Sequence, residues 1–183
     1  SEVDEVLERI KRLLERLAEH SDKVVRDIEK LLDDNRKENE RLLDKLRREL
    51  KRLEEMRRRG DLREELLERV VREVEKEIRD IKRKNKRSVE TVEKLVRDDR
   101  KELKRALEDV ERLIRELETR LKDKEELRRK LERDHMVLHE YVNAAGITTD
   151  EVLKRARETI EDLNRKLDKV LKEVRDKLDR LRD

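Results

Sequence analysis

The stretch LLDKLRRELKRLEEMRRRGDLREELLERVVREVEKEI, residues 42–78, decides the fold of this chain. Before Met56 its apolar residues recur at steps of three and four, which places them on one face of a helix. The pattern stops at RRRGD, where Gly60 follows a last turn rich in arginine, as is typical of a helix C-terminus. It resumes at Leu62, so this stretch predicts two helices joined by a tight turn.

The same apolar pattern extends in both directions from this stretch, with one weaker break at KDK, residues 122–124. We therefore expect helices over about 2–58, 61–121 and 124–182, each about 90 Å long if continuous. Helices of equal length joined by short turns favour an up-down-up arrangement. The predicted fold is all-α: a long antiparallel three-helix bundle, monomeric, formed by one domain over residues 1–183.

The composition supports a helical protein and argues against several functions. Charged residues make up 57% of the chain, and it has no Cys, Pro, Trp or Phe. Because 54 basic residues nearly balance 51 acidic ones and the signs alternate, no uncompensated basic face is expected for nucleic acid. No run of about 18 apolar residues predicts a membrane span, and SEVDEVLERI lacks the organisation of a signal peptide.

Polar residues on the apolar stripe predict two buried layers. If the first two helices fold back about Gly60, Ser21 faces Asp99 and Asn35 faces Asn85. Buried polar layers select one register at some cost in stability; the alternative is that these residues lie at the stripe edge in water. With the third helix added, the expected layers are Ser21, Asp99 and Asn143, and Asn35, Asn85 and Thr159.

The simple surface, equal helices, missing aromatic residues and paired polar layers resemble de novo designed helical bundles. The resemblance covers the whole chain but concerns style only, so it implies no function by itself. A natural coiled-coil scaffold is the alternative for the fold.

The window 135–149 differs from the rest of the chain, because only Glu140 in it carries a formal charge. It also holds the single Tyr and two of the three His. Read at helical spacing, Leu138, Val142 and Ala145 share one face. Read at a period of two, its residues alternate as in a strand, and Gly146 disfavours a helix interior. The window thus carries two conflicting patterns.

Residues 133–148, RDHMVLHEYVNAAGIT, resemble the eleventh strand of green fluorescent protein in the engineered form used as a small tag in split-fluorescence complementation. We call residues 133–148 the embedded segment. Its residues are Arg133, Asp134, His135, Met136, Val137, Leu138, His139, Glu140, Tyr141, Val142, Asn143, Ala144, Ala145, Gly146, Ile147 and Thr148.

The resemblance implies that the segment adds the missing strand to a ten-strand fragment of that barrel, whose open edges drive strand addition. The chromophore forms in that fragment, so this chain alone is not expected to fluoresce. The resemblance implies that Glu140 faces the chromophore. It places Met136, Leu138, Val142 and Ala144 on the same inward face, and His139 and Tyr141 outward.

These observations give one main functional hypothesis and two alternatives. The main one is a bundle that cages the segment in helical form until a competing helical peptide or another trigger releases it to the ten-strand fragment. One alternative is a static scaffold that tests a strand sequence in a helix. The other is a plain tagged bundle whose helix breaks near Gly146, where TTDE, residues 148–151, offers a capping box.

Other motifs carry less weight. His135 and His139 lie at i and i+4 and could chelate a metal ion on a helix, but the tag resemblance already accounts for both, so no metal or cofactor is expected. The tripeptide of residues 59–61, Arg-Gly-Asp, resembles the integrin-binding motif, but a turn between charged helices produces it by chance, so we expect no role in adhesion. No nucleophile–base arrangement or phosphate loop is present, so we expect no enzyme activity.

Overall fold

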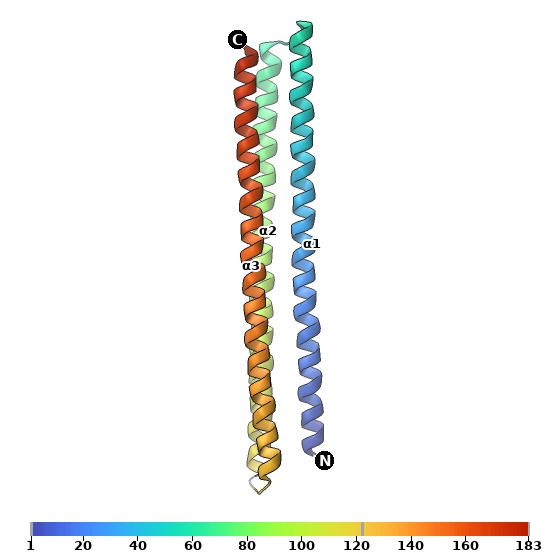
Figure 1. The fold of residues 1–183 in the computed structure, drawn as a ribbon, viewed down its shortest axis with the longest axis vertical. Coiled ribbons are helices and arrows are strands. Elements are labelled where there is room, and N and C mark those ends of the chain that lie inside the picture. Colours follow the sequence, from blue (N-terminus) through green and yellow to red (C-terminus); the bar gives the residue numbers. More distant parts are fainter. Residues whose placement is uncertain (1, 122, 183) are drawn as a thin grey trace. The chain divides into compact units, whose positions relative to one another are not determined.

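The computed structural model describes residues 2–121 and 123–182. These residues form three α-helices, shown in Figure 1: α1 (Glu2–Arg59), α2 (Glu64–Arg120) and α3 (Glu125–Arg182). The expectation of an all-α fold built from three long helices is confirmed, and the helix ends lie within three residues of the predicted ones. In the described part of the chain, no helix is long and apolar enough to cross a membrane.

The first turn has the capping geometry that the sequence predicts. Gly60 has a φ of 76°, a conformation that residues with a Cβ adopt at a cost. Its N–H donates to the Arg57 carbonyl at 3.0 Å, and the Asp61 N–H donates to the Met56 carbonyl at 3.0 Å. This pair of bonds is a Schellman motif, which satisfies carbonyls at the end of α1.

The second turn follows the buried Leu121, whose N–H still donates to the Leu117 carbonyl at 3.0 Å. The chain then turns through Asp123 and Lys124 before α3 begins, and Lys124 donates back to the Leu121 carbonyl at 2.9 Å. The predicted break at residues 122–124 agrees with these positions, except that Lys122 lies outside the described residues.

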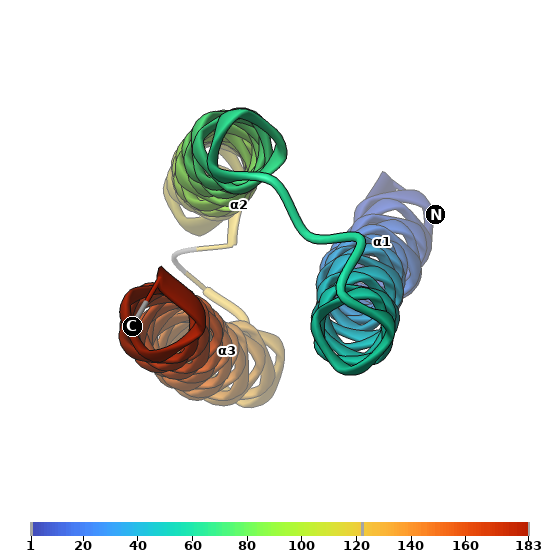
Figure 2. The same ribbon diagram turned by 90° about the horizontal axis from the view of Figure 1, so that it is seen from above.

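The helices contribute to two compact units. The first unit contains Ser1–Ile28 and Val92–Lys154, and the second contains Glu29–Thr91 and Arg155–Asp183. Within each unit, segments of all three helices lie at the corners of a triangle, as Figure 2 shows. In each unit the segment of α2 runs antiparallel to those of α1 and α3. That the chain behaves as one domain and as a monomer stays a prediction.

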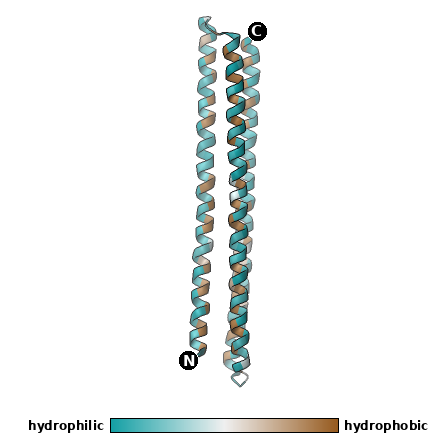
Figure 3. Cartoon of the chain, turned by 180° about the vertical axis from the view of Figure 1, so that it is seen from behind, coloured by the Kyte–Doolittle hydropathy of each residue, from teal (hydrophilic) through white to brown (hydrophobic). Residues whose placement is uncertain are grey.

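Each unit has its own apolar core, formed by the inward stripes that appear brown in Figure 3. In the first unit Ile10, Val110, Ile114, Leu131 and Leu138 pack together. The core of the second unit is built from leucine, isoleucine and valine on all three helices: Leu43, Leu46, Leu50, Leu53, Leu67, Val70, Val74, Ile78, Ile81, Leu167, Val174 and Leu178. Burial of these side chains is the main stabilising contribution to each unit.

The second unit contains a buried asparagine layer to which all three helices contribute. Asn39 and Asn85 exchange two side-chain hydrogen bonds, of 2.9 and 3.1 Å. Asn85 Nδ2 also donates to Asn164 Oδ1 at 3.0 Å, and Asn39 Nδ2 donates to the Asn35 carbonyl at 2.7 Å. Asn35 and Asn85 are buried as expected, but the α1 partner of Asn85 is Asn39, one turn beyond Asn35.

The first unit contains a second polar cluster, centred on Asp99, which is fully buried. The Ser21 hydroxyl donates to Asp99 Oδ1 at 3.3 Å, so the structure brings these two predicted residues together. His20, which the sequence reasoning missed, places its Nδ1 2.9 Å from the same oxygen. His20 lies next to Ser21 on the apolar stripe of α1, and this position could have identified it as a member of the cluster.

The predictions for α3 were wrong in register. Asn143 is exposed and does not join the Asp99 cluster. Thr159 is half-buried and borders a groove with Asn39, while Asn164 supplies the α3 side chain that bonds Asn85.

The reason is an offset of about one and a half turns between α2 and α3, since Asn164 takes the place predicted for Thr159, five residues earlier. The prediction assumed a symmetric second turn, whereas α3 begins beyond the buried Leu121. Each α2 residue therefore faces a later α3 residue, as the Arg100–Asp150 ion pair illustrates. Thr149, next to Asp150, is buried with 2% exposure and takes an inward position that we did not predict. Thr149 lies four residues after Ala145, and this helical spacing could have predicted its inward position.

Candidate functional site: the embedded segment

The embedded segment is helical along its whole length within α3. Gly146 lies inside the helix without a positive φ. The Thr148 hydroxyl donates to the Ala144 carbonyl and the Thr149 hydroxyl donates to the Gly146 carbonyl, each at 3.0 Å. These bonds point back along the helix, so residues 148–151 do not begin a new helix and the alternative of a break near Gly146 is contradicted.

The inward face of the segment packs on the first unit's core. Leu138 is fully buried and belongs to the cluster that contains Ile10, Val110 and Leu131. Val142 bridges this cluster to a smaller one, where Tyr141 and Ala145 are half-buried against Leu17, Leu103 and Ala106. The helical reading of the segment therefore identified its buried residues correctly.

The opposite face exposes apolar side chains that would normally be covered. Met136 is 64% exposed, Val137 57% and Ile147 60%, and these are the large hydrophobic residues that stand exposed in the described part of the chain. Glu140 and Ala144 are exposed as well. The helix thus separates residues that the strand alternation places on one face, since Leu138 is buried while Met136, Glu140 and Ala144 face solvent.

Two histidines of the segment converge on one carboxylate of α2. His135 Nε2 and His139 Nε2 each lie 3.1 Å from Glu111 Oε1. The hydrogen bond from His135 is the largest cause that holds the pKa of Glu111 below its usual range, and His139 adds to it. The two rings meet edge to face, with centroids 4.9 Å apart. These contacts attach the segment to α2 beside the core.

Tyr141 lies near enough to Asp22 and Asp99 for their charges to affect its pKa. Its half-buried position raises the pKa of the phenol, and the negative charges of Asp22 and Asp99 raise it further. The neutral phenol is therefore favoured in the folded first unit.

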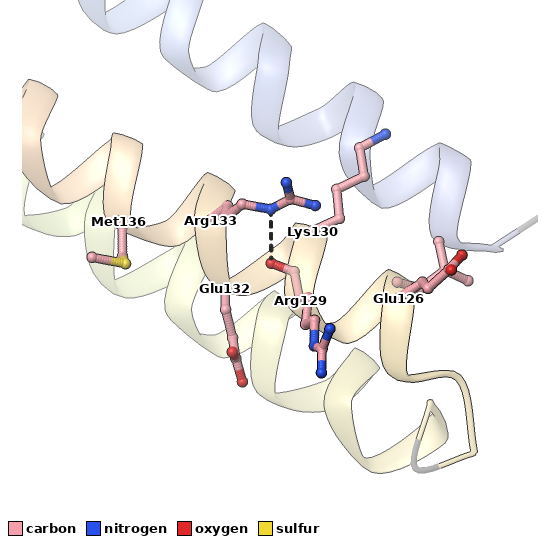
Figure 4. Close-up of a pocket in the computed structure, with 7 residues that line it drawn as sticks. Glu126, Arg129, Lys130, Glu132, Arg133 and Met136 are labelled. Atoms are coloured by element: carbon pink, nitrogen blue, oxygen red, sulfur yellow. Dashed lines mark hydrogen bonds between the residues drawn. The ribbon is translucent and has the colours of Figure 1, made fainter.

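A shallow surface hollow adjoins the first turns of the segment. Figure 4 shows Arg129, Glu132 and Met136 on one face of α3, and all of the lining residues belong to α3. Arg133 Nε donates to the Arg129 carbonyl at 3.4 Å. Because no other helix lines this hollow, the N-terminal part of the segment is accessible from solvent on this side.

Buried residues hold α3 on both sides of the segment. Leu131, before it, is fully buried, and Val152, after it, is 3% exposed. Both lie in the first unit. Further along α3, Ala156 and Leu167 are fully buried in the second unit. The segment thus exposes large apolar side chains in a helix that is anchored on both sides of it.

Comparisons with known proteins include a structural likeness to a designed bundle. No known family matches the chain, and no curated protein sequence matches it. A solved structure described as a "Computationally designed three helix bundle" is similar over 98% of this chain and 79% of that chain, with 20% identity and a TM-score of 0.40. The three α-helices and their two apolar cores establish the all-α fold class.

Proposed function

We propose that this chain is a designed helical bundle that cages the eleventh-strand tag of split green fluorescent protein in helical form. Release of the embedded segment lets it complete the ten-strand fragment, so that fluorescence reports the opening of α3. The partners are the ten-strand fragment and a helical peptide that competes for the place of α3. The protein acts as a monomeric binding switch, not as an enzyme, and no nucleic acid or membrane takes part.

The observation that supports this proposal is that the helix and a barrel strand would bury different residues of the segment. Leu138 is fully buried in the helix while Met136 is 64% exposed, although a barrel strand would turn both to one side. The segment spans about 24 Å as a helix and about 54 Å as a strand. One conformation excludes the other, so complementation requires this part of α3 to detach.

The two states are balanced by opposite contributions. Three exposed apolar side chains and the helix-interior Gly146 weaken the helical state locally. The buried flanks, including Leu131 and Val152, favour it. Moving such an equilibrium from 1:99 to 99:1 takes about 5.5 kcal/mol, which is within the reach of a few buried leucines.

The test mixes the protein with the ten-strand fragment and follows fluorescence with time. It compares three samples: the chain alone, the chain with a competitor peptide, and the free segment peptide as the reference for an uncaged strand. The competitor keeps the apolar stripe of residues 124–183 but carries charged helix-forming residues at the other positions of 133–148, so that it cannot itself complete the barrel. We expect slow complementation by the chain, a rate near that of the free peptide when the competitor is present, and no effect of the competitor on the free peptide.

Two results would contradict the proposal. Complementation by the chain alone at the rate of the free peptide would mean that α3 holds nothing back, as in a plain tagged bundle. Absence of fluorescence with excess competitor, while circular dichroism shows that the competitor has bound, would favour the static scaffold instead.

A further inference from the structure

We propose that Glu111, His135 and His139 form a binding site for a divalent transition-metal ion such as Zn²⁺. One donor atom from each of the three residues lies within 4.8 Å of the other two. Glu111 belongs to α2 and both histidines belong to the embedded segment of α3. The site therefore joins the segment to a different helix of the same unit.

The distances from the Glu111 oxygen to the two histidine nitrogens fit tetrahedral coordination. Zinc bonds of about 2.0–2.1 Å at tetrahedral angles put neighbouring donor atoms about 3.3 Å apart. Glu111 Oε1 is 3.1 Å from each histidine Nε2, close to that value, and all three donor atoms lie within 4.8 Å of one another, so side-chain rotation can bring them to one ion. Two imidazoles and one carboxylate suit Zn²⁺, Co²⁺ and related ions, and the fourth position is left for water.

The three side chains already have positions that suit metal binding in the ion-free protein. The histidines lie one helical turn apart on the same face, and the edge-to-face contact of their rings, at 4.9 Å, keeps both Nε2 atoms directed at one oxygen. Glu111 is half-buried, which restricts its carboxylate. In the ion-free protein each Nε2 proton donates to Glu111, and in the bound state neutral rings carry that proton on Nδ1 instead.

A metal ion at this site would also control release of the segment, an inference that rests on the proposed function. In a barrel strand the two histidines no longer have Glu111 beside them. An ion that needs all three donors binds only while the segment is helical, so it stabilises the closed state. Bound metal is therefore expected to oppose release.

The first experiment measures binding without the barrel. Protein freed of any oligohistidine tag is titrated with Zn²⁺ by calorimetry and with Co²⁺ by visible absorption. We expect one ion per chain and the absorption of four-coordinate Co²⁺, and at least a tenfold loss of affinity in Glu111→Gln. The matched control is Glu108→Gln, which removes the same charge from an exposed position one turn away on α2 and should bind as the parent does.

The second experiment measures the complementation rate with Zn²⁺ at about 100 times its dissociation constant. A ligand at that level shifts the equilibrium toward the binding state about 100-fold, so the rate should fall about 100-fold. Glu111→Gln should lose most of this effect, and the free segment peptide, tested with the same Zn²⁺, corrects for any effect on the barrel itself. Since Glu111 lies outside the segment, this variant leaves the strand sequence unchanged.

The two readouts separate the two proposals. Absence of Co²⁺ absorption, or equal affinity of the parent and Glu111→Gln, overturns the metal site and leaves caging unaffected. Tight binding through Glu111 without any change in complementation rate retains the metal site and overturns the coupling to release.

Discussion

At the scale of single residues, the embedded segment has to satisfy two periodicities. Leu138 and Val142 suit both, because they fall on the helix stripe and on the face of the strand that the resemblance would turn inward. Met136 suits only the strand and is exposed in the helix. The buried residues of the segment could be predicted from helical spacing alone. The contacts of His135 and His139 with Glu111 could not, since they depend on the offset between α2 and α3.

Gly146→Ala should stabilise the helical state of the segment. A Cβ built on Gly146 meets nothing within 4 Å, so the gain in helix propensity, about 1 kcal/mol, comes without a clash. The comparison is Gly60→Ala, which also has open space but lies at a φ of 76° and should destabilise by about 1–2 kcal/mol. Urea unfolding followed by circular dichroism measures both, and shifts of the same sign would contradict this account.

Tyr141 should titrate above the range of a free tyrosine. Because its pKa is raised in the folded state, its contribution to stability is complete below about pH 10 and is lost as pH rises through the folded pKa. The chain contains a single Tyr and no Trp, so tyrosinate absorbance reports this residue alone. We expect a higher midpoint for the chain than for the free segment peptide. Equal midpoints would place the phenol in water.

At the scale of elements, the continuity of α3 follows from the stripe that crosses the segment from Leu138 through Ala145 to Val152. The surrounding helix overrides the strand preference of the segment, since the flanks are buried on both sides. The register of α3 against α2 was not predictable in the same way. It depends on how the chain passes from Leu121 to Glu125, and a pattern of apolar residues is compatible with shifts of one turn.

Leu131→Ala should open the segment without changing its sequence. Leu131 is fully buried two residues before the segment, and removal of such a side chain costs about 2–5 kcal/mol. If Leu131→Ala weakens the packing of α3 on the other helices by about 2 kcal/mol, the open fraction and the complementation rate rise about 30-fold.

The matched control for that change is Lys130→Ala, at an exposed position on the same turn of α3, where substitutions are nearly neutral. Circular dichroism checks that both variants remain helical. Equal complementation rates for Leu131→Ala and Lys130→Ala would mean that the flank of the segment does not hold it closed.

At the scale of the whole molecule, apolar stripes specify three helices but leave their register and association open. Leucines one turn apart are nearly interchangeable, so a bundle can slip or pair with another chain. Polar groups in each unit act against this: the asparagine layer in the second and the Asp99 cluster in the first. The existence of such layers was predictable from polar residues on the stripe. Their membership required the actual offsets between helices.

Replacing the three asparagines that bond one another should therefore change stability and specificity in opposite directions. In Asn39→Leu/Asn85→Leu/Asn164→Leu these hydrogen-bonded side chains become apolar together, so we expect a higher urea midpoint. Asn85→Ala alone should instead lower the midpoint, because it leaves the side-chain oxygens of Asn39 and Asn164 without their donor, at about 1–3 kcal/mol for a buried group. Analytical ultracentrifugation should find the parent monomeric and the triple variant self-associating as concentration rises. A triple variant that stays monomeric at all concentrations would show that the asparagine layer contributes nothing to the choice of partner, and that the Asp99 cluster or the turns suffice.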